Sequence, residues 1–192
     1  KYKGVMPRGT TITLRDNTVC IAPYAFRNCS TLKAIIIPES VTTIGRGAFE
    51  NCKGLSTITL PRGITNLDSR AFQGCSGIKS LVWDIPTFSE KFPLASLRAQ
   101  LSSLELGAHV QHIPDAFCSG MSRLSSVCVG ANVLSLGDAV FSGCTALKTI
   151  KWLSTCYQPK AQVSPFAEVA SQITSITLAD SLTTIPAHLC AG

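Results

Sequence analysis

Apolar residues recur along this chain in a short spacing, and that spacing itself repeats with a long period. The spacing is apolar-x-x-apolar-x-apolar, and successive copies begin 23 residues apart over most of the sequence. The copies begin at Leu32, Leu55, Ile78, Leu101, Leu124, Leu147 and Ile173, the last after a step of 26 residues. A fixed period of about 20 to 29 residues is typical of a solenoid in which every repeat forms one coil.

Within each copy, apolar and polar residues alternate, as in the stretch STITL at residues 56–60. Alternation of this kind predicts a strand that has one face on the core and the other in solvent. Pro38 and Pro61 follow two of these strands, and proline ends a strand because it has no N–H to donate. We predict a right-handed leucine-rich repeat solenoid with one parallel strand per 23-residue repeat. Short helical or 3-10 turns, for example near AFENC at residues 48–52, would connect the strands.

A second set of apolar positions shares the same period and predicts a second row of core residues. Its members are Ile21, Ile44, Leu67, Ile113, Leu136 and Ile185. The residues four and five positions after each member form a pair that combines a large and a small residue in most coils, such as Ala48-Phe49 or Ala71-Phe72. A close-packed interior requires a nearly constant volume, so one large side chain per coil is expected from either position.

Two repeats depart from this pattern, and each follows a tryptophan, Trp83 or Trp152. The sequences after them are alike: FPLASLRAQLSSLEL at residues 92–106 resembles SPFAEVASQITSITL at residues 164–178. The chain therefore contains a duplicated unit of three coils, of which one is irregular. We expect each tryptophan to point inward and to fill the space left by the irregular coil that follows it.

The stretch PESVTTIGRGAFENCKGLSTITLP at residues 38–61 resembles the repeat of the BspA-like leucine-rich repeat family. The resemblance extends over essentially the whole chain and is weakest in the two irregular repeats. It implies a secreted or surface-attached protein that mediates adhesion to host matrix proteins or to other cells. The family has no catalytic motif that could be carried over, so the resemblance implies a protein that is not an enzyme and has no cofactor.

The period also predicts the domain organisation. Residues 1–192 form a single leucine-rich repeat domain of about eight coils, in which Ile12 and Leu14 belong to a partial first copy. Lys1 and Gly192 both lie inside a repeat, so we expect a fragment that is truncated at both ends.

Composition and charge argue against nucleic-acid binding and against a membrane-spanning segment. The net charge of +6 comes from single Lys and Arg residues scattered along the chain, without a basic cluster or interleaved aromatic residues. Binding to nucleic acid is therefore not expected. No apolar run approaches the roughly 18 residues of a membrane span, and the first ten residues lack the apolar segment of a signal peptide.

The nine cysteines indicate buried thiols rather than a disulfide framework or a metal site. Most of them fall at core positions of the repeat: Cys29, Cys52, Cys75 and Cys144 share a column with Met121, and Cys118 and Cys190 stand where other coils have Phe. Cys20, Cys128 and Cys156 lie outside the core columns. The pair of Cys118 and His112 could in principle serve a hydrolase, but Cys118 is expected to be buried and the three histidines to lie at the surface.

The remaining candidate for function is the solvent face of the strands. Its outward positions are predicted to be Thr57, Thr59, Ser80, Val82, Ser103, Glu105, Ser126, Thr149 and Lys151. The loops of the irregular coils are a competing site, with Tyr157, Gln158 and Lys160 as the predicted contacts. The leading hypothesis is a cell-surface or secreted, non-catalytic module that binds a protein or cell-surface ligand such as a host matrix protein. The alternative is a structural spacer without a ligand of its own, and the oligomeric state is left open.

Overall fold

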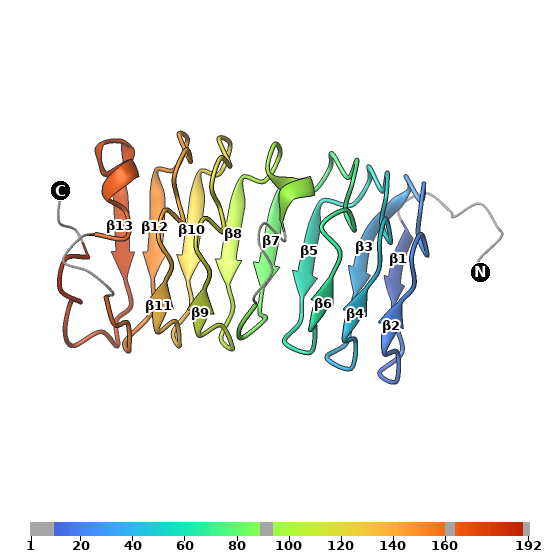
Figure 1. Cartoon of the computed structure of the whole chain (residues 1–192), viewed down its shortest axis with the longest axis horizontal. Coiled ribbons are helices and arrows are strands. Elements are labelled where there is room, and N and C mark those ends of the chain that lie inside the picture. Colours follow the sequence, from blue (N-terminus) through green and yellow to red (C-terminus); the bar gives the residue numbers. More distant parts are fainter. Residues whose placement is uncertain (1–9, 89–93, 160–163, 190–192) are drawn as a thin grey trace.

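The computed structural model describes residues 10–88, 94–159 and 164–189, which form a parallel β-solenoid (Figure 1). Eight long strands of the described residues, one per coil, lie side by side along the long axis from β1 to β13. These strands are β1 (Thr10–Thr13), β3 (Leu32–Ile36), β5 (Thr57–Leu60), β7 (Ser80–Trp83), β8 (Ser103–Leu106), β10 (Ser126–Val129), β12 (Thr149–Trp152) and β13 (Ser175–Leu178). The predicted solenoid with a strand in every repeat is therefore confirmed.

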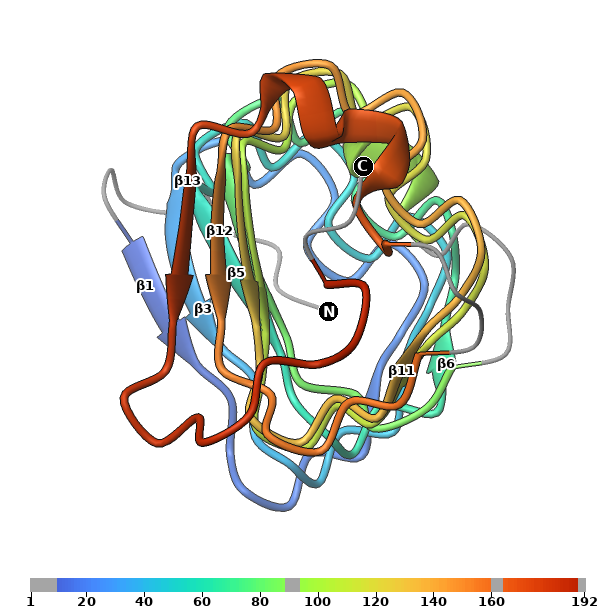
Figure 2. The same cartoon turned by 90° about the vertical axis from the view of Figure 1, so that its left-hand side faces the viewer.

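Five shorter strands lie on the opposite side of the core, as the view along the axis in Figure 2 shows. They are β2 (Cys20–Ile21), β4 (Thr43–Ile44), β6 (Asn66–Leu67), β9 (His112–Ile113) and β11 (Ser135–Leu136). Each contributes one buried residue from the second predicted row, from Ile21 to Leu136. Ile185, the last member predicted for that row, is instead 59% exposed, because it lies in the last described coil and no described coil covers its outer side.

The long strands pair in parallel, and the register is regular except between β1 and β3, where it shifts between Thr10 and Thr11. Six of them form a continuous sheet in the order β13-β12-β10-β8-β7-β5, and β1 and β3 form a separate pair. Within the described residues, strand pairing is therefore interrupted between β3 and β5. The short strands form the sheets β2-β4-β6 and β9-β11, so their pairing is interrupted between β6 and β9.

The first apolar residue of each of the six regularly spaced copies, from Leu32 to Leu147, is fully buried. Large side chains stack from coil to coil in the same interior: the ring centroid of Phe49 lies 5.4 Å from that of Phe26 and 5.3 Å from that of Phe72. A single coil cannot bury these side chains, so the stability of the fold depends on the contacts between neighbouring coils.

The return segments of the regular coils differ from the predicted helical turns. Around residues 48–52 the chain makes successive hydrogen-bonded turns, with Cys52 N–H donating to Phe49 O at 3.0 Å. The N–H of Phe49 donates to Ala71 O of the next coil at 2.9 Å. Because these N–H groups bond to a neighbouring coil, they cannot continue a helical ladder. In the described residues, 3-10 helix occurs only in the two irregular coils, as η1 (Ala95–Leu97) and η2 (Ala167–Gln172).

The two irregular coils are built alike. Trp83 and Trp152 are buried, and each meets an aromatic ring of the irregular segment edge to face. Phe88 lies 5.3 Å from Trp83 and Tyr157 lies 5.0 Å from Trp152, with interplanar angles of 89° in both pairs. The tryptophans therefore fill the space behind the irregular coils, as the sequence predicts.

Candidate binding surfaces

The nine predicted side chains of the strand face lie together on the outer side of the six-stranded sheet. The parallel register places equivalent residues of neighbouring coils next to one another in two rows. The first row is Thr57, Ser80, Ser103, Ser126, Thr149 and Ser175, and the second is Thr59, Val82, Glu105, Cys128, Lys151 and Thr177. We call these twelve residues the strand face.

The strand face combines hydroxyl groups with little charge. All six residues of its first row carry a hydroxyl, and neighbouring strands of a sheet lie about 4.8 Å apart. Thr57, Thr149 and Lys151 are exposed, whereas Ser80 and Ser103 are half-buried among their neighbours. The result is a flat surface with regularly spaced hydrogen-bonding groups and no aromatic side chain.

The charged residues of this face flank a thiol. Cys128 pairs in register with Glu105 on one side and with Lys151 on the other. Partial burial raises the pKa of the Cys128 thiol and the Glu105 carboxylate raises it further, while the Lys151 ammonium group acts in the opposite direction. The raised pKa keeps the thiol protonated at neutral pH, so Cys128 is not an activated nucleophile.

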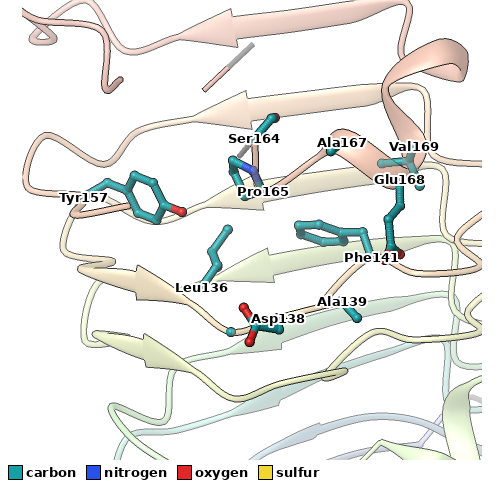
Figure 3. Close-up of a pocket in the computed structure, with 11 residues that line it drawn as sticks. Leu136, Asp138, Ala139, Phe141, Tyr157, Ser164, Pro165, Ala167, Glu168 and Val169 are labelled. Carbon is teal, nitrogen blue, oxygen red and sulfur yellow. The ribbon is translucent and has the colours of Figure 1, made fainter. Parts of the chain in front are cut away.

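Of the two predicted loop contacts that the structure describes, Tyr157 is the less available to a ligand. Its ring is half-buried against Trp152, and this burial raises the pKa of its hydroxyl group. With Leu136 and Phe141 it lines a cavity of about 150 Å³ (Figure 3). Gln158 is exposed, and its backbone N–H donates to Leu134 O at 2.7 Å. Lys160 lies outside the described residues.

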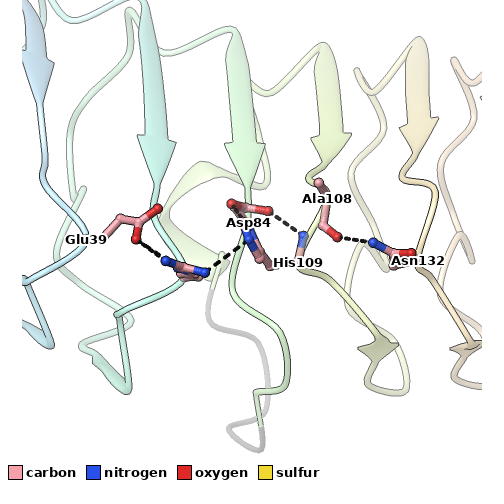
Figure 4. A network of polar contacts seen from close by, with 6 residues as sticks. Glu39, Asp84, Ala108, His109 and Asn132 are labelled. Carbon is pink, nitrogen blue, oxygen red and sulfur yellow. Dashed lines mark hydrogen bonds and ion pairs between the residues drawn. The ribbon is translucent and has the colours of Figure 1, made fainter.

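A polar network that the sequence did not predict lies below the carboxyl ends of the long strands (Figure 4). The Arg62 guanidinium group contacts the Glu39 carboxylate, with Nε donating to Oε2 at 2.8 Å. Arg62 Nη1 lies 3.3 Å from His109 Nε2, and His109 Nδ1 lies 2.7 Å from Asp84 Oδ2. The contacts to these two carboxylates join residues 23 and 25 positions apart, Arg62 to Glu39 and His109 to Asp84. The period of the repeat could have revealed the first of these pairs.

The same edge contains a shallow groove of about 380 Å³. Its lining runs from Arg62, in the coil of β5, through Pro86 of the first irregular coil to Cys156 of the second irregular coil. Between them, the regular coils contribute polar groups that include His109, Gln111 and Asn132. We call this feature the edge groove.

Most of the predicted core cysteines are buried thiols. Cys52, Cys75, Cys118 and Cys144 have no exposed surface, and burial raises the pKa of the Cys144 thiol to about 11. Cys29, the first of its column, is half-buried because it lies in the first complete coil. The eight cysteines that the structure describes are free thiols, and Cys190 lies outside the described residues.

Neither a metal site nor a membrane span is found in the described ranges. No three His, Cys, Asp or Glu side chains there are arranged to hold a metal ion. None of the helices described is long and apolar enough to cross a bilayer. His109, His112 and His188 are exposed, as predicted.

Comparison with known proteins gives a family match. The family model described as the BspA type leucine rich repeat region, in six copies, matches residues 8–92 and 96–191. No curated protein matches significantly.

Two solved structures share the fold. A leucine-rich repeat protein from Eubacterium ventriosum is similar over 93% of this chain, with 23% sequence identity and a TM-score of 0.50. An internalin from Listeria monocytogenes is similar over 82% of this chain, with 20% identity and a TM-score of 0.54. The chain spans 45% and 44% of the lengths of these two proteins, respectively.

Proposed function

Because the chain belongs to the BspA-type leucine-rich repeat proteins, we propose that it is a non-catalytic protein-binding module. One observation carries this proposal: the strand face extends over six coils, and no other described element covers it. Solenoids use such extended faces to bind partners, since the repeats present equivalent side chains over a long distance. The protonated thiol of Cys128 is consistent with a surface that binds rather than reacts.

The location and the partner are finer parts of the proposal. We infer that the protein acts at the cell surface or in secreted form, and that it mediates adhesion to a host matrix protein or another cell. Membership of the BspA-type family supports this inference. The likeness to an internalin concerns the fold alone.

A structural spacer is the second candidate, and one observation favours it. The described strand face has no aromatic side chain and no arginine, which are the residues that most often dominate the binding energy of protein interfaces. A spacer would hold other parts of a protein apart without retaining a partner.

Matched substitutions separate these possibilities. Ser126→Arg places a long charged side chain at the centre of the strand face, Gln158→Arg does the same on the loop, and Gln73→Arg is the control in an exposed return turn. Beads coated with each variant are tested for adhesion to immobilised matrix proteins and to partner cells, after circular dichroism has verified the fold. We expect Ser126→Arg to reduce adhesion at least tenfold and the control to leave it unchanged.

The same experiment can reject the proposal. Loss of adhesion with Gln158→Arg alone would assign binding to the loop. If the unmodified chain adhered to none of the tested proteins or cells, the spacer would be favoured.

A further inference from the structure

The cavity of about 150 Å³ in Figure 3 lies between the return turn that follows β11 and the irregular coil that contains η2. Its lining includes the buried apolar side chains of Leu136, Phe141 and Val169. In Figure 3, Leu136 and Phe141 lie between Tyr157 and Glu168. The cavity is on the β11 side of the core, across from the strand face (Figure 2). We call it the η2 cavity.

The polar groups of the η2 cavity are negative and have no partner of their own. Asp138 and Glu168 line the cavity and are exposed to solvent. Neither carboxylate forms a hydrogen bond or an ion pair within the described residues, and no Lys, Arg or His of that part of the chain lines the cavity. The hydroxyl group of Tyr157 has no hydrogen-bond partner there either. These three groups are therefore available to a ligand.

Contacts within the fold hold both walls of the η2 cavity in place. The N–H of Asp138 donates to Asp115 Oδ1 at 2.8 Å, which fixes the turn that carries the Asp138 carboxylate. On the other wall, Ser164 is buried, its hydroxyl donates to Leu189 O at 2.8 Å, and its Oγ accepts the N–H of Phe166 at 3.1 Å. Because the walls are already ordered, a ligand does not have to order them when it binds.

The first unit of the duplication lacks the polar groups of this cavity. Both units contain a tryptophan that meets an aromatic ring edge to face, and both contain a 3-10 helix. Three equivalent positions differ: Phe88, Ser69 and Ser96 stand where the second unit has Tyr157, Asp138 and Glu168. The shared fold therefore requires neither the hydroxyl group nor the two carboxylates, and a structural role does not account for them.

We propose that the η2 cavity receives the side chain of a lysine or an arginine from a partner protein. Such a side chain packs its aliphatic stem on apolar surface and keeps its charged end among polar groups. Leu136 and Phe141 suit the stem, whereas the carboxylates of Asp138 and Glu168 attract the cation and accept its hydrogen bonds. A cavity of about 150 Å³ can hold a molecule of the size of benzene, so the stem fits. The inference deepens the proposed protein-binding function and rests on it.

The lining suits an organic cation better than a metal ion or an anion. Calcium takes roughly six to eight oxygen ligands, and no three His, Cys, Asp or Glu side chains of the described residues are arranged to hold a metal ion. The apolar side chains of Leu136, Phe141 and Val169 offer no such ligand. An acidic side chain would be repelled by Asp138 and Glu168.

Nuclear magnetic resonance titration of the full chain tests the proposal. The probes are three acetylated and amidated tripeptides, in which lysine, arginine or norleucine stands between two glycines. Norleucine has an aliphatic stem like that of lysine but no charge. We expect the lysine and arginine peptides to shift the signals of Ala139 and Val169, and the norleucine peptide to bind about tenfold more weakly. Comparison of the two basic peptides shows which cation the cavity prefers.

Variants separate the contribution of charge from that of space. Asp138→Asn and Glu168→Gln each remove one charge at nearly constant shape, and each should weaken binding of the lysine peptide about threefold. Ala167→Leu enlarges an exposed residue of the lining and should weaken binding without changing the charge. Asp16→Asn is the matched control, because Asp16 lies in an exposed turn between β1 and β2 and loses the same charge far from the cavity. Circular dichroism verifies the fold of each variant.

Several results would overturn the proposal. Equal binding of the lysine and norleucine peptides would mean that the cavity does not recognise charge. Unchanged binding in both Asp138→Asn and Glu168→Gln would place the cation elsewhere, and unchanged binding in a folded Ala167→Leu variant would place it outside the cavity. Shifts of the same signals by calcium chloride, with none by the lysine peptide, would assign the two carboxylates to a metal ion.

The outcome is separate from that of the adhesion experiment. Adhesion without any shift on peptide titration would overturn the η2 cavity as a site and leave the protein-binding function standing. Binding of the lysine peptide without adhesion to any protein or cell would support the receptor for a basic side chain and contradict the proposed function.

Discussion

At the scale of single residues, the irregular coils depend on pairs of aromatic rings that recur 69 positions apart. Trp152 is fully buried, and its indole N–H donates to Ser154 O at 2.9 Å. Ser154 is itself fully buried, with its hydroxyl donating to Val133 O at 2.7 Å. These two buried side chains therefore have hydrogen-bond partners, as buried polar groups generally must.

Tyr157 belongs to this aromatic arrangement, so its main contribution should be to stability. Its counterpart in the first irregular coil is Phe88, which makes the same edge-to-face contact without a hydroxyl. We expect Tyr157→Phe to change the free energy of unfolding by less than about 0.5 kcal/mol. Tyr157→Ala should lower it by about 2 kcal/mol, less than for a fully buried aromatic residue because the ring is only half-buried.

Urea denaturation monitored by circular dichroism measures both effects. Gln158→Ala is the control, because this neighbouring side chain is exposed and should leave stability unchanged. Equal destabilisation by Tyr157→Phe and Tyr157→Ala would mean that the hydroxyl rather than the ring is responsible.

At the scale of elements, a glutamine after η1 and another at the end of η2 make coil-to-coil contacts that differ from those of the regular coils. There, the thiol of one coil donates to the previous coil, as Cys75 Sγ does to Phe49 O at 2.9 Å. After η1 the Gln100 amide donates instead to Cys75 O at 2.9 Å, and at the end of η2 the Gln172 amide donates to Cys144 O. The recurrence explains why the two irregular sequences share a glutamine.

Removing this contact should loosen the irregular coil. Gln100→Ala leaves Cys75 O without the amide donor, and we expect it to lower the free energy of unfolding by about 1 kcal/mol. Gln73→Ala, in an exposed return turn, should be close to neutral. Urea denaturation of both variants checks this, and similar effects at the two positions would contradict the assigned role of the Gln100 amide.

The sequence predicts the regular elements well because burial in a solenoid has a fixed period. Leu55, Ile58 and Leu60 are buried in the structure at the positions that the alternation indicates. The return turns were predicted less well, because a local sequence does not show that the N–H of Phe49 bonds to Ala71 of another coil.

The candidate sites also differ in how far the sequence could predict them. The strand face follows from the register, so its members could be identified from the sequence. The contact between Arg62 and His109 spans the first irregular coil and joins residues 47 positions apart. This contact depends on the path of the irregular coil that follows Trp83. That coil departs from the repeat pattern, so no spacing in the sequence indicates the contact.

At the scale of the whole molecule, the interruptions in strand pairing are staggered. Pairing of the long strands stops between β3 and β5, where the short strands β4 and β6 remain paired and Phe49 stacks on Phe72. Pairing of the short strands stops between β6 and β9, where β5, β7 and β8 are continuous. Every junction between neighbouring described coils therefore retains at least one hydrogen-bonded strand pair.

This staggering predicts that the chain unfolds as one unit, since the stability of a solenoid is carried by the interfaces between neighbouring coils and none of these lacks strand pairing. Trp83 and Trp152 report on different coils, those of β7 and β12. In the variants Trp83→Phe and Trp152→Phe, the fluorescence of the remaining tryptophan should follow the same urea transition as the far-ultraviolet circular dichroism of that variant. Comparison within each variant cancels the destabilisation that the substitution causes. A plateau, or fluorescence and dichroism midpoints that differ within one variant, would show that the coils on the two sides of an interruption unfold separately, and that strand pairing on one side of the core is not enough to couple them.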